Sequence, residues 1–437
     1  MKKFIVILIL IILSFTGYVV YVEMTKNKEE PLLAELEKVE ITEYFIYGTT
    51  LSMKGSLTVE NLDFDEIDLI LYNKDLKLGK KESKEKRFTS IPIIYEKNEN
   101  VVNFSLSNLI NEGMYLDNIE ENKYTMFIRT TKKEMVEEEE QIIYKYYSLN
   151  NTTEYPETTY YTMSKYNRKI VINSNNDYET MMLNVEKNKD EEIYDIVIDA
   201  GHGGRDPGAV VRGEKESTYT IDLALKLAEK LKNSNIKVKL TRDENTLGEK
   251  EFFSEYGKGG RAQISHEVSA KYVISIHLNQ NNSSSVNGVE LYTPANINYD
   301  FAKHLIENIV TNTSIGYSDR KTFKMFNGIY THNFTEQEIQ KSLDGYAQKN
   351  YEPYNVTTNS SYLYMIRETG GIMTGAYVDD RNEEQVGNEY YNSNIGSEAY
   401  LLEVCYLSNQ NDMRILKEEQ DKYIDAIANS IIVNFDK

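Results

Sequence analysis

Four residues whose side chains suit metal binding or proton transfer occupy comparable places in the sequence. His202 follows one apolar run and His277 closes another. Glu403 lies inside a third apolar run, and Glu216 directly precedes a helical pattern. In α/β proteins, ligands bind at the carboxyl ends of the strands. Two histidines and one glutamate with an open fourth position make a catalytic zinc arrangement, and a second glutamate is then free to act as a general base.

Each of these residues also suits a structural role when it is considered singly. A histidine after a strand is often a hydrogen-bonded structural residue, and a glutamate such as Glu216 at the start of a helix is favoured by the helix dipole. Glu403 is harder to explain structurally, because a buried carboxylate without a partner is costly and its neighbours Leu402 and Val404 predict burial. Residue types and spacing alone therefore leave a zinc site and structural roles both open.

The elements that must position these residues alternate between strand and helix after a charged linker at 186–192. Period-2 and near-continuous apolar runs predict strands, and a period near 3.6 predicts helices. We expect strands at 193–200, 236–242, 271–277, 288–293 and 399–407, and helices at 217–234, 261–270, 300–310 and 412–434. In the first helix, Ile221, Leu225, Ala228 and Leu231 predict one buried face. This order predicts a mixed or parallel sheet covered by helices on both faces.

The chain from about residue 195 to 437 resembles the zinc-dependent N-acetylmuramoyl-L-alanine amidases of the amidase 3 type. The motifs that carry the resemblance are IVIDAGHGGRDPGA, GEKEST…IDLALKLAEKL, TRDE, YVISIHLNQN…NGVELY and AYLLEVCYLSN. The resemblance implies a twisted, mostly parallel sheet flanked by helices. It also implies that the zinc ligands are His202, Glu216 and His277, and that Glu403 is the catalytic glutamate.

Two features depart from the compact members of that family. Glu214 also precedes the first helix and is the alternative ligand to Glu216. The segment 311–397 is a long insertion, which we expect to border the cleft, and Thr335 and Glu338 predict a capping box within it. Asp199 and Asn279 are candidates for supporting the metal ligands, although a plain structural role is equally open for each.

The resemblance implies hydrolysis of the amide bond between N-acetylmuramic acid and L-alanine in cell-wall peptidoglycan. Zinc would activate the attacking water, and Glu403 would take its proton and pass it to the leaving amine. One alternative is a related zinc peptidase that cleaves a peptide bond by the same chemistry. The other is a non-catalytic cell-wall-binding or regulatory protein, against which the presence of every ligand position argues.

Composition excludes other classes of function. The formal net charge of −20 argues against nucleic-acid binding, which needs a basic surface. Cys405 is the single cysteine, so no intramolecular disulfide is possible. A length of 437 residues predicts two or more folded units.

The N-terminal segment carries a membrane signal. Residues 4–22 contain no charge, and at ~1.5 Å per residue they would span about 28 Å as a helix, close to the hydrocarbon core of a bilayer. Lys2 and Lys3 precede the run and predict a cytoplasmic N-terminus. We expect a single-pass signal anchor with the catalytic domain outside the cytoplasm, in a bacterial cell envelope. A cleaved signal peptide is the alternative, with the same location for the rest of the chain.

The region between the anchor and the α/β domain reads as β-rich. Residues 23–38 are polar and predict a stalk, and 39–185 predict an antiparallel, sandwich-like domain. Strands are expected at 39–47, 67–73, 101–107, 124–130 and 141–148, with more within 158–173 and 180–185. The sequence of this region contains no metal-binding or nucleophile motif. We therefore expect a spacer or an interaction domain, and the sequence does not indicate its protein partner.

Overall fold

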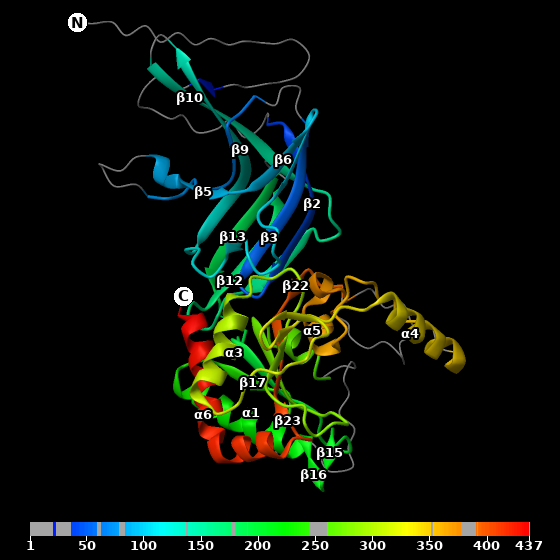
Figure 1. The fold of residues 1–437 in the computed structure, drawn as a ribbon. Helices are drawn as coiled ribbons and strands as arrows, with labels where there is room; N and C mark the ends of the chain where they lie inside the picture. Colours follow the sequence, from blue (N-terminus) through cyan, green and yellow to red (C-terminus); the bar gives the residue numbers. More distant parts are fainter. Residues whose placement is uncertain are drawn as a thin grey trace, which may run out of the picture.

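The computed structural model describes residues 21–22, 36–58, 63–77, 84–136, 139–175, 180–189, 191–243, 260–350, 353–376, 390 and 392–436. A β-rich unit comes first along the chain, and an α/β unit follows it (Figure 1). The two units lie end to end, with the long strands of the first standing on one end of the second (Figure 1).

Most of the predicted membrane anchor, 4–22, lies outside the described residues. Its last two residues, Tyr21–Val22, form strand β1, which is antiparallel to Ile143 and Tyr144 in β10. A helix that extends to Val22 is therefore wrong for these two positions. Among the residues that the structure describes, no helix is long and apolar enough to cross a membrane.

The β-rich unit is a single hydrogen-bonded network of strands. They are β2 (Lys38–Tyr47), β3 (Thr50–Thr58), β4 (Glu66–Tyr72), β5 (Phe88–Pro92), β6 (Ile94–Asn98), β7 (Val101–Ser105), β8 (Met114–Tyr115), β9 (Asn122–Val136), β10 (Glu139–Asn151), β11 (Glu157–Tyr161), β12 (Arg168–Asn175) and β13 (Thr180–Lys187). Their order is β11-β12-β13-β9-β10-β2-β3-β7-β6, and β4 and β5 join through β9. The main apolar core of this unit includes Ile41, Leu69, Met126 and Leu183, and a smaller cluster contains Ile70, Tyr72 and Phe127. The predicted β-rich domain is thus present, and its strands are joined in one hydrogen-bonded network.

The α/β unit contains a seven-stranded mixed sheet. Its strands are β14 (Ile196–Ala200), β17 (Val238–Leu240), β18 (Tyr272–Asn279), β19 (Glu290–Tyr292), β20 (Lys324–Phe326), β21 (Ile329–Tyr330) and β23 (Glu398–Tyr406). In the order β17-β14-β18-β23-β19-β21-β20, the first four are mutually parallel, and β19 then runs antiparallel to β23. The predicted α/β fold with a mostly parallel sheet is confirmed, and the strand predicted at 288–293 is β19, which lies antiparallel beside Glu403.

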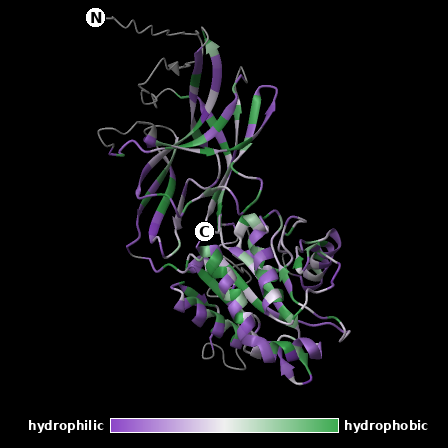
Figure 2. Cartoon of the chain, turned by 60° about the vertical axis from the view of Figure 1, so that its left-hand side comes forward, coloured by the Kyte–Doolittle hydropathy of each residue, from purple (hydrophilic) through white to green (hydrophobic). Residues whose placement is uncertain are grey.

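Helices cover both faces of this sheet. They are α1 (Glu216–Asn233), α2 (Ile264–Glu267), α3 (Asp300–Asn312), α4 (Glu336–Lys349), α5 (Tyr364–Thr369) and α6 (Gln410–Phe435). Alternation along the strands divides the core: Ile196 and Ile198 pack with α1, α3 and α6, whereas Val197 packs with α2 and α5. Hydrophobic residues concentrate in the central strands, and hydrophilic residues cover the surrounding helices (Figure 2).

The β-rich unit docks on the end of the sheet where β18 and β23 begin. The short strand β22 (Ile395–Gly396) pairs in parallel with β2, and the Tyr47 hydroxyl accepts a hydrogen bond from the backbone N–H of Ala399 at 3.3 Å. Asn111 donates to the Glu398 carboxylate at 3.1 Å. Because His277 and Glu403 lie near the other ends of the same two strands, the β-rich unit supports the strands that carry them.

A buried lysine lies at this junction. Lys271 is 2% exposed and interacts electrostatically with Asp117 of the β-rich unit and Asp195 of the α/β unit. Burial lowers the pKa of Lys271 to about 8, although both aspartates act to raise it. Asp117 is fully buried and accepts hydrogen bonds from Tyr160 at 3.0 Å and from the backbone of Met163 at 3.1 Å.

Removing this lysine should destabilise the whole chain. Lys271→Met leaves the buried carboxylate of Asp117 without its positive neighbour, and we expect the free energy of unfolding to fall by about 1–3 kcal/mol. Adding Asp117→Asn should restore part of that loss, because the uncompensated charge is then gone. Denaturant unfolding of both single variants and the double variant measures the coupling, and additive losses would contradict it.

Candidate metal centre and active site

His202 lies in the loop that follows β14. His202 has a φ of 60°, which is uncommon for a residue other than glycine. The glycines of this loop leave room for the site: a Cβ on Gly201 would lie 2.4 Å from Cε1 of His277, and one on Gly208 would lie 2.5 Å from Cδ2 of His202. The glycines are therefore required by close approach of the two imidazoles to the loop backbone.

Two histidines meet one buried carboxylate at the carboxyl end of the sheet. Nε2 of His202 lies 3.1 Å from Oε2 of Glu216, and Nδ1 of His277 lies 3.0 Å from Oε1 of the same residue. One ligand atom from each of the three residues lies within 4.8 Å of the others. The structure thus brings together the three residues that the sequence predicted as metal ligands.

Backbone and side-chain contacts hold this group in place. The Glu216 carboxylate accepts hydrogen bonds from the backbone N–H groups of Ala209 and Leu278, each at 2.9 Å. Nδ1 of His202 lies 2.8 Å from Oδ2 of Asp206. A carboxylate on Nδ1 orients the imidazole so that Nε2 faces Glu216, as in the histidine ligands of metal sites.

The charges of the site are strongly coupled. Burial opposes ionisation of Glu216, but hydrogen bonds and charge from His202 and His277 outweigh it and hold the pKa of Glu216 far below its usual range. Burial also acts to lower the pKa of His202, while Glu216 and Asp206 raise it to about 8. An anionic carboxylate between two imidazoles fits a divalent cation, because the donor set is the one that catalytic zinc takes.

Glu403 faces this group from the adjoining strand. In the parallel register of β18 and β23, Glu403 is the partner of His277. Its side chain is half-buried, and its Oε2 atom is buried without a hydrogen-bond partner among the described residues. Burial, followed by the charges of Glu216 and Glu290, raises the pKa of Glu403 well above its usual value. A raised pKa and a free oxygen suit proton transfer.

Glu290 is a site residue that the sequence analysis missed. It is fully buried and lies directly opposite Glu403 in the antiparallel pairing of β19 with β23. Its donors are the Tyr406 hydroxyl at 2.5 Å, Ser318 at 2.6 Å, the Tyr292 hydroxyl at 2.8 Å and Asn279 at 3.0 Å. The available signal was an acid inside the apolar run GVELY. Asn279 therefore supports Glu290, and none of the described hydrogen bonds joins its side chain to His277.

The insertion 311–397 contributes to the site through its first residues. Ser318 binds Glu290, and Nη1 of Arg320 lies 3.6 Å from the same carboxylate and 2.6 Å from the Tyr292 hydroxyl. The predicted capping box is confirmed, since Thr335 and Glu338 bond each other at the start of α4. Helix α4 has no buried residue and projects from the body of the unit (Figure 1), so it is this nearer part of the insertion that borders Glu403.

Asp199 supports His202 through an arginine. The buried Asp199 accepts hydrogen bonds from Arg261 at 2.7 Å and Ser275 at 2.6 Å, and Arg261 also donates to the backbone carbonyl of His202 at 2.8 Å. Arg242 donates to the carbonyl of Gly201 at 3.1 Å. The two guanidinium groups thus fix the backbone that carries His202 in its left-handed conformation.

The alternative ligand, Glu214, lies outside the group. Its carboxylate accepts a hydrogen bond from Tyr219 and lies 2.7 Å from Nζ of Lys417. The structure therefore favours Glu216 over Glu214.

Cys405 is fully buried against Met413.

Two imidazoles around one carboxylate, with a second carboxylate on the adjoining strand, define a candidate hydrolase centre on an α/β fold. Comparison with known proteins gives the class its name. The chain belongs to the N-acetylmuramoyl-L-alanine amidase family, because residues 196–433 match the family model Amidase_3. The protein is thus a peptidoglycan amidase, a hydrolase of the bond between N-acetylmuramic acid and L-alanine.

Individual relatives carry the same description. The chain is 28% identical over 215 residues to a putative N-acetylmuramoyl-L-alanine amidase of Buchnera aphidicola subsp. Baizongia pistaciae, a match that covers 47% of this chain and 93% of the relative. It is 25% identical over 247 residues to the amidase AmiA of Escherichia coli, covering 55% and 75%. The solved catalytic domain of CwlV from Bacillus (Paenibacillus) polymyxa is 24% identical, with a TM-score of 0.36 and coverage of 56% and 99%.

Proposed function

We propose that this amidase is zinc-dependent, that His202, Glu216 and His277 hold the ion, and that Glu403 is the general base. The observation that carries the proposal is the grouping of the three ligand atoms within 4.8 Å of one another. The placement of Glu403 beside His277 on the next strand adds the base. Two neutral imidazoles and one carboxylate leave an open coordination position, as catalytic zinc requires.

In this mechanism each residue has a separate task. A zinc ion held by His202, Glu216 and His277 would lower the pKa of the attacking water and stabilise negative charge on the amide oxygen. Glu403 would accept a proton from the attacking water and return it to the nitrogen of L-alanine as the amide bond breaks. Asp206 keeps a proton on Nδ1 of His202, which leaves Nε2 free as a ligand.

Product analysis tests the proposal on the full chain. Purified peptidoglycan should yield peptides with a free N-terminal L-alanine, identified by mass spectrometry, together with intact glycan strands. Chelation should abolish the products and zinc should restore them, with metal content near one ion per chain. Cleavage between two amino acids would support a zinc peptidase instead, and undiminished activity of the metal-free protein would overturn the zinc assignment.

Zinc binding should depend on pH because a proton competes for His202. The pKa of His202 is raised to about 8, so below that pH the protonated imidazole must lose its proton before it can bind the metal. We expect the apparent zinc affinity to fall about tenfold per pH unit below pH 8 and to level off above it. Competition titrations between pH 6 and pH 9 measure this.

Asp206→Asn gives the matched control for that titration. Asp206 is one of the two carboxylates that raise the pKa of His202, and the asparagine keeps an oxygen near Nδ1 without the charge. The pH at which zinc affinity begins to fall should therefore move downward. An affinity that is independent of pH from 6 to 8 would contradict the competition.

We also propose that the uncharged run anchors the protein in the membrane through residues 4–20, with residues 39–437 outside the cytoplasm. Support comes from the uncharged run and from Lys2 and Lys3 before it. Protease added to intact cells stripped of their wall should digest the region 39–437. Full protection of that region would contradict this topology.

A further inference from the structure

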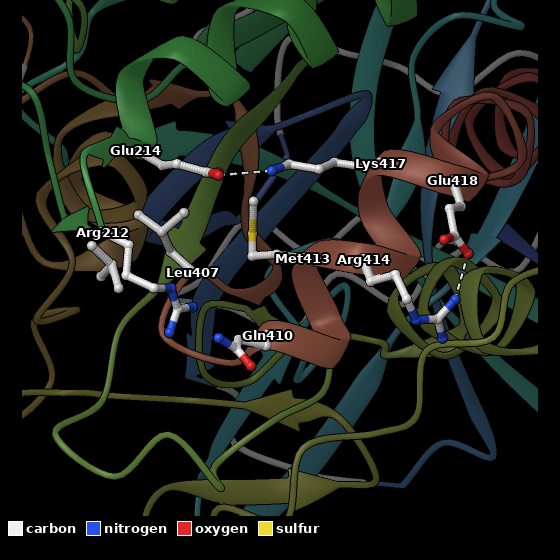
Figure 3. Close-up of a pocket in the computed structure, with 9 residues that line it drawn as sticks. Arg212, Glu214, Leu407, Gln410, Met413, Arg414, Lys417 and Glu418 are labelled. Carbon is white, nitrogen blue, oxygen red and sulfur yellow. Dashed lines mark hydrogen bonds and ion pairs between the residues drawn. The ribbon is translucent and has the colours of Figure 1, made fainter.

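A cavity of about 310 Å³ opens on the α/β unit (Figure 3). It lies between the hairpin of β15 (Val210–Val211) and β16 (Glu214–Lys215) and the start of α6. Val211, Leu407 and Met413 form its apolar wall. Arg212 and Gln410 also line the cavity, and both are exposed (Figure 3).

The chain places this cavity within reach of the reacting bond. The hairpin leads directly into Glu216, since β16 ends at Lys215. Leu407 follows Glu403 by four residues, which is at most about 13 Å along an extended strand. A peptide of four residues spans at most about 14 Å when extended. The peptide part of the substrate is therefore long enough to reach from Glu403 into the cavity.

Most charges of the cavity are already paired. Lys417 lies 2.7 Å from Glu214, and Arg414 forms an ion pair with Glu418. Among the described residues, the Arg212 guanidinium has one hydrogen bond, a weak one of 3.4 Å to the Ser408 carbonyl, and no ion pair. The backbone of Arg212 is held at a φ of 53° in the hairpin. The charge of Arg212 also acts on Glu214, but among the described residues that carboxylate forms its ion pair with Lys417.

We propose that this cavity binds the peptide part of the substrate and that Arg212, with Gln410, binds the free carboxylate at its C-terminal end. The proposal rests on the amidase activity. A guanidinium can hold a carboxylate through two parallel N–H···O bonds, and the Gln410 amide can donate a third. The apolar wall suits the side chains that precede the carboxylate. The site would thus favour substrates with an uncapped peptide of about four residues.

Two soluble substrates test this directly, each an N-acetylmuramoyl tetrapeptide that begins with L-alanine. One ends in a carboxylate and the other in a carboxamide. We expect the unaltered enzyme to cleave the carboxamide with a kcat/KM about tenfold lower, mainly through KM. Arg212→Gln should lower kcat/KM for the carboxylate substrate about tenfold and leave the carboxamide substrate nearly unchanged. The variant should therefore no longer distinguish the two substrates.

Lys215→Gln is the matched control, because Lys215 is exposed on the same hairpin and does not line the cavity. It removes the same charge and should keep the tenfold preference. Equal losses on both substrates in Arg212→Gln would show a structural role and overturn the proposal, as would an unaltered enzyme without a preference. Failure of the amidase assignment would differ from both, since neither substrate would then be cleaved.

Discussion

Glu403→Gln should lower turnover by about 10²–10⁴-fold while zinc remains bound. The substitution keeps the size of the side chain and removes its ability to accept a proton. The three candidate ligands are unchanged and lie within 4.8 Å of one another without Glu403. Replacing a carboxylate whose pKa is raised by burial and by Glu216 and Glu290 also removes a charge conflict, so the fold should not be weakened.

The measurement combines metal content, thermal unfolding and turnover on the same preparation. Glu229→Gln is a suitable control, because Glu229 is exposed on α1 and the change in charge is the same. It should leave all three readouts unchanged. A Glu403→Gln enzyme that keeps full turnover would remove the proposed base, and one that loses zinc would make Glu403 a ligand.

The sequence could predict that the candidate metal ligands lie close together, because their positions depend on the apolar runs that form strands and on where those strands end. His202 and His277 each lie at or near the end of an apolar run, and parallel strands bring such ends to one edge. Glu290 could not be placed in the same way. Its neighbour Tyr406 is 116 residues away in sequence, and only the antiparallel insertion of β19 beside β23 brings the two together. Sequence periodicity carries no information on that strand order.

Helix α1 shows a second limit of pattern reasoning. The sequence contains overlapping apolar rows, and the row that begins at Ile221 was predicted to be buried. The structure buries Leu223, Leu227 and Leu231, together with the alanines that adjoin them, and leaves Ile221 half-buried. The rows differ by a fraction of a turn, and packing against α6 and β14 decides between them. The docking of the β-rich unit likewise depends on tertiary contacts between units, which strand patterns do not encode.

The second large expected effect is on zinc binding, and it distinguishes the two glutamates that lie at or just before the start of α1. Glu216→Gln should weaken zinc binding by more than about 100-fold, and activity should be lost with the metal. Residues that only hydrogen-bond to a ligand reduce metal affinity by up to about 100-fold when they are replaced. Glu216 is 3% exposed and is the residue that both imidazoles contact. A neutral amide there would also remove the larger of the two carboxylate effects that raise the pKa of His202, and leave that of Asp206.

Glu214→Gln is the matched control, two residues away on the same hairpin. Its carboxylate binds Lys417 and Tyr219 at the surface, so zinc affinity should stay within about twofold of that of the unaltered protein. Zinc titration of both variants separates the two assignments. Loss of a metal ligand should reduce zinc affinity by more than the loss of a residue that only hydrogen-bonds to a ligand. If Glu214→Gln lost the metal and Glu216→Gln kept it, the ligand would be Glu214, and the hairpin would have to turn to bring that carboxylate to the histidines. If neither variant lost zinc, the third ligand would be Glu403. The Glu403→Gln variant would then release zinc. Retention of zinc by that variant would instead identify Glu403 as the base.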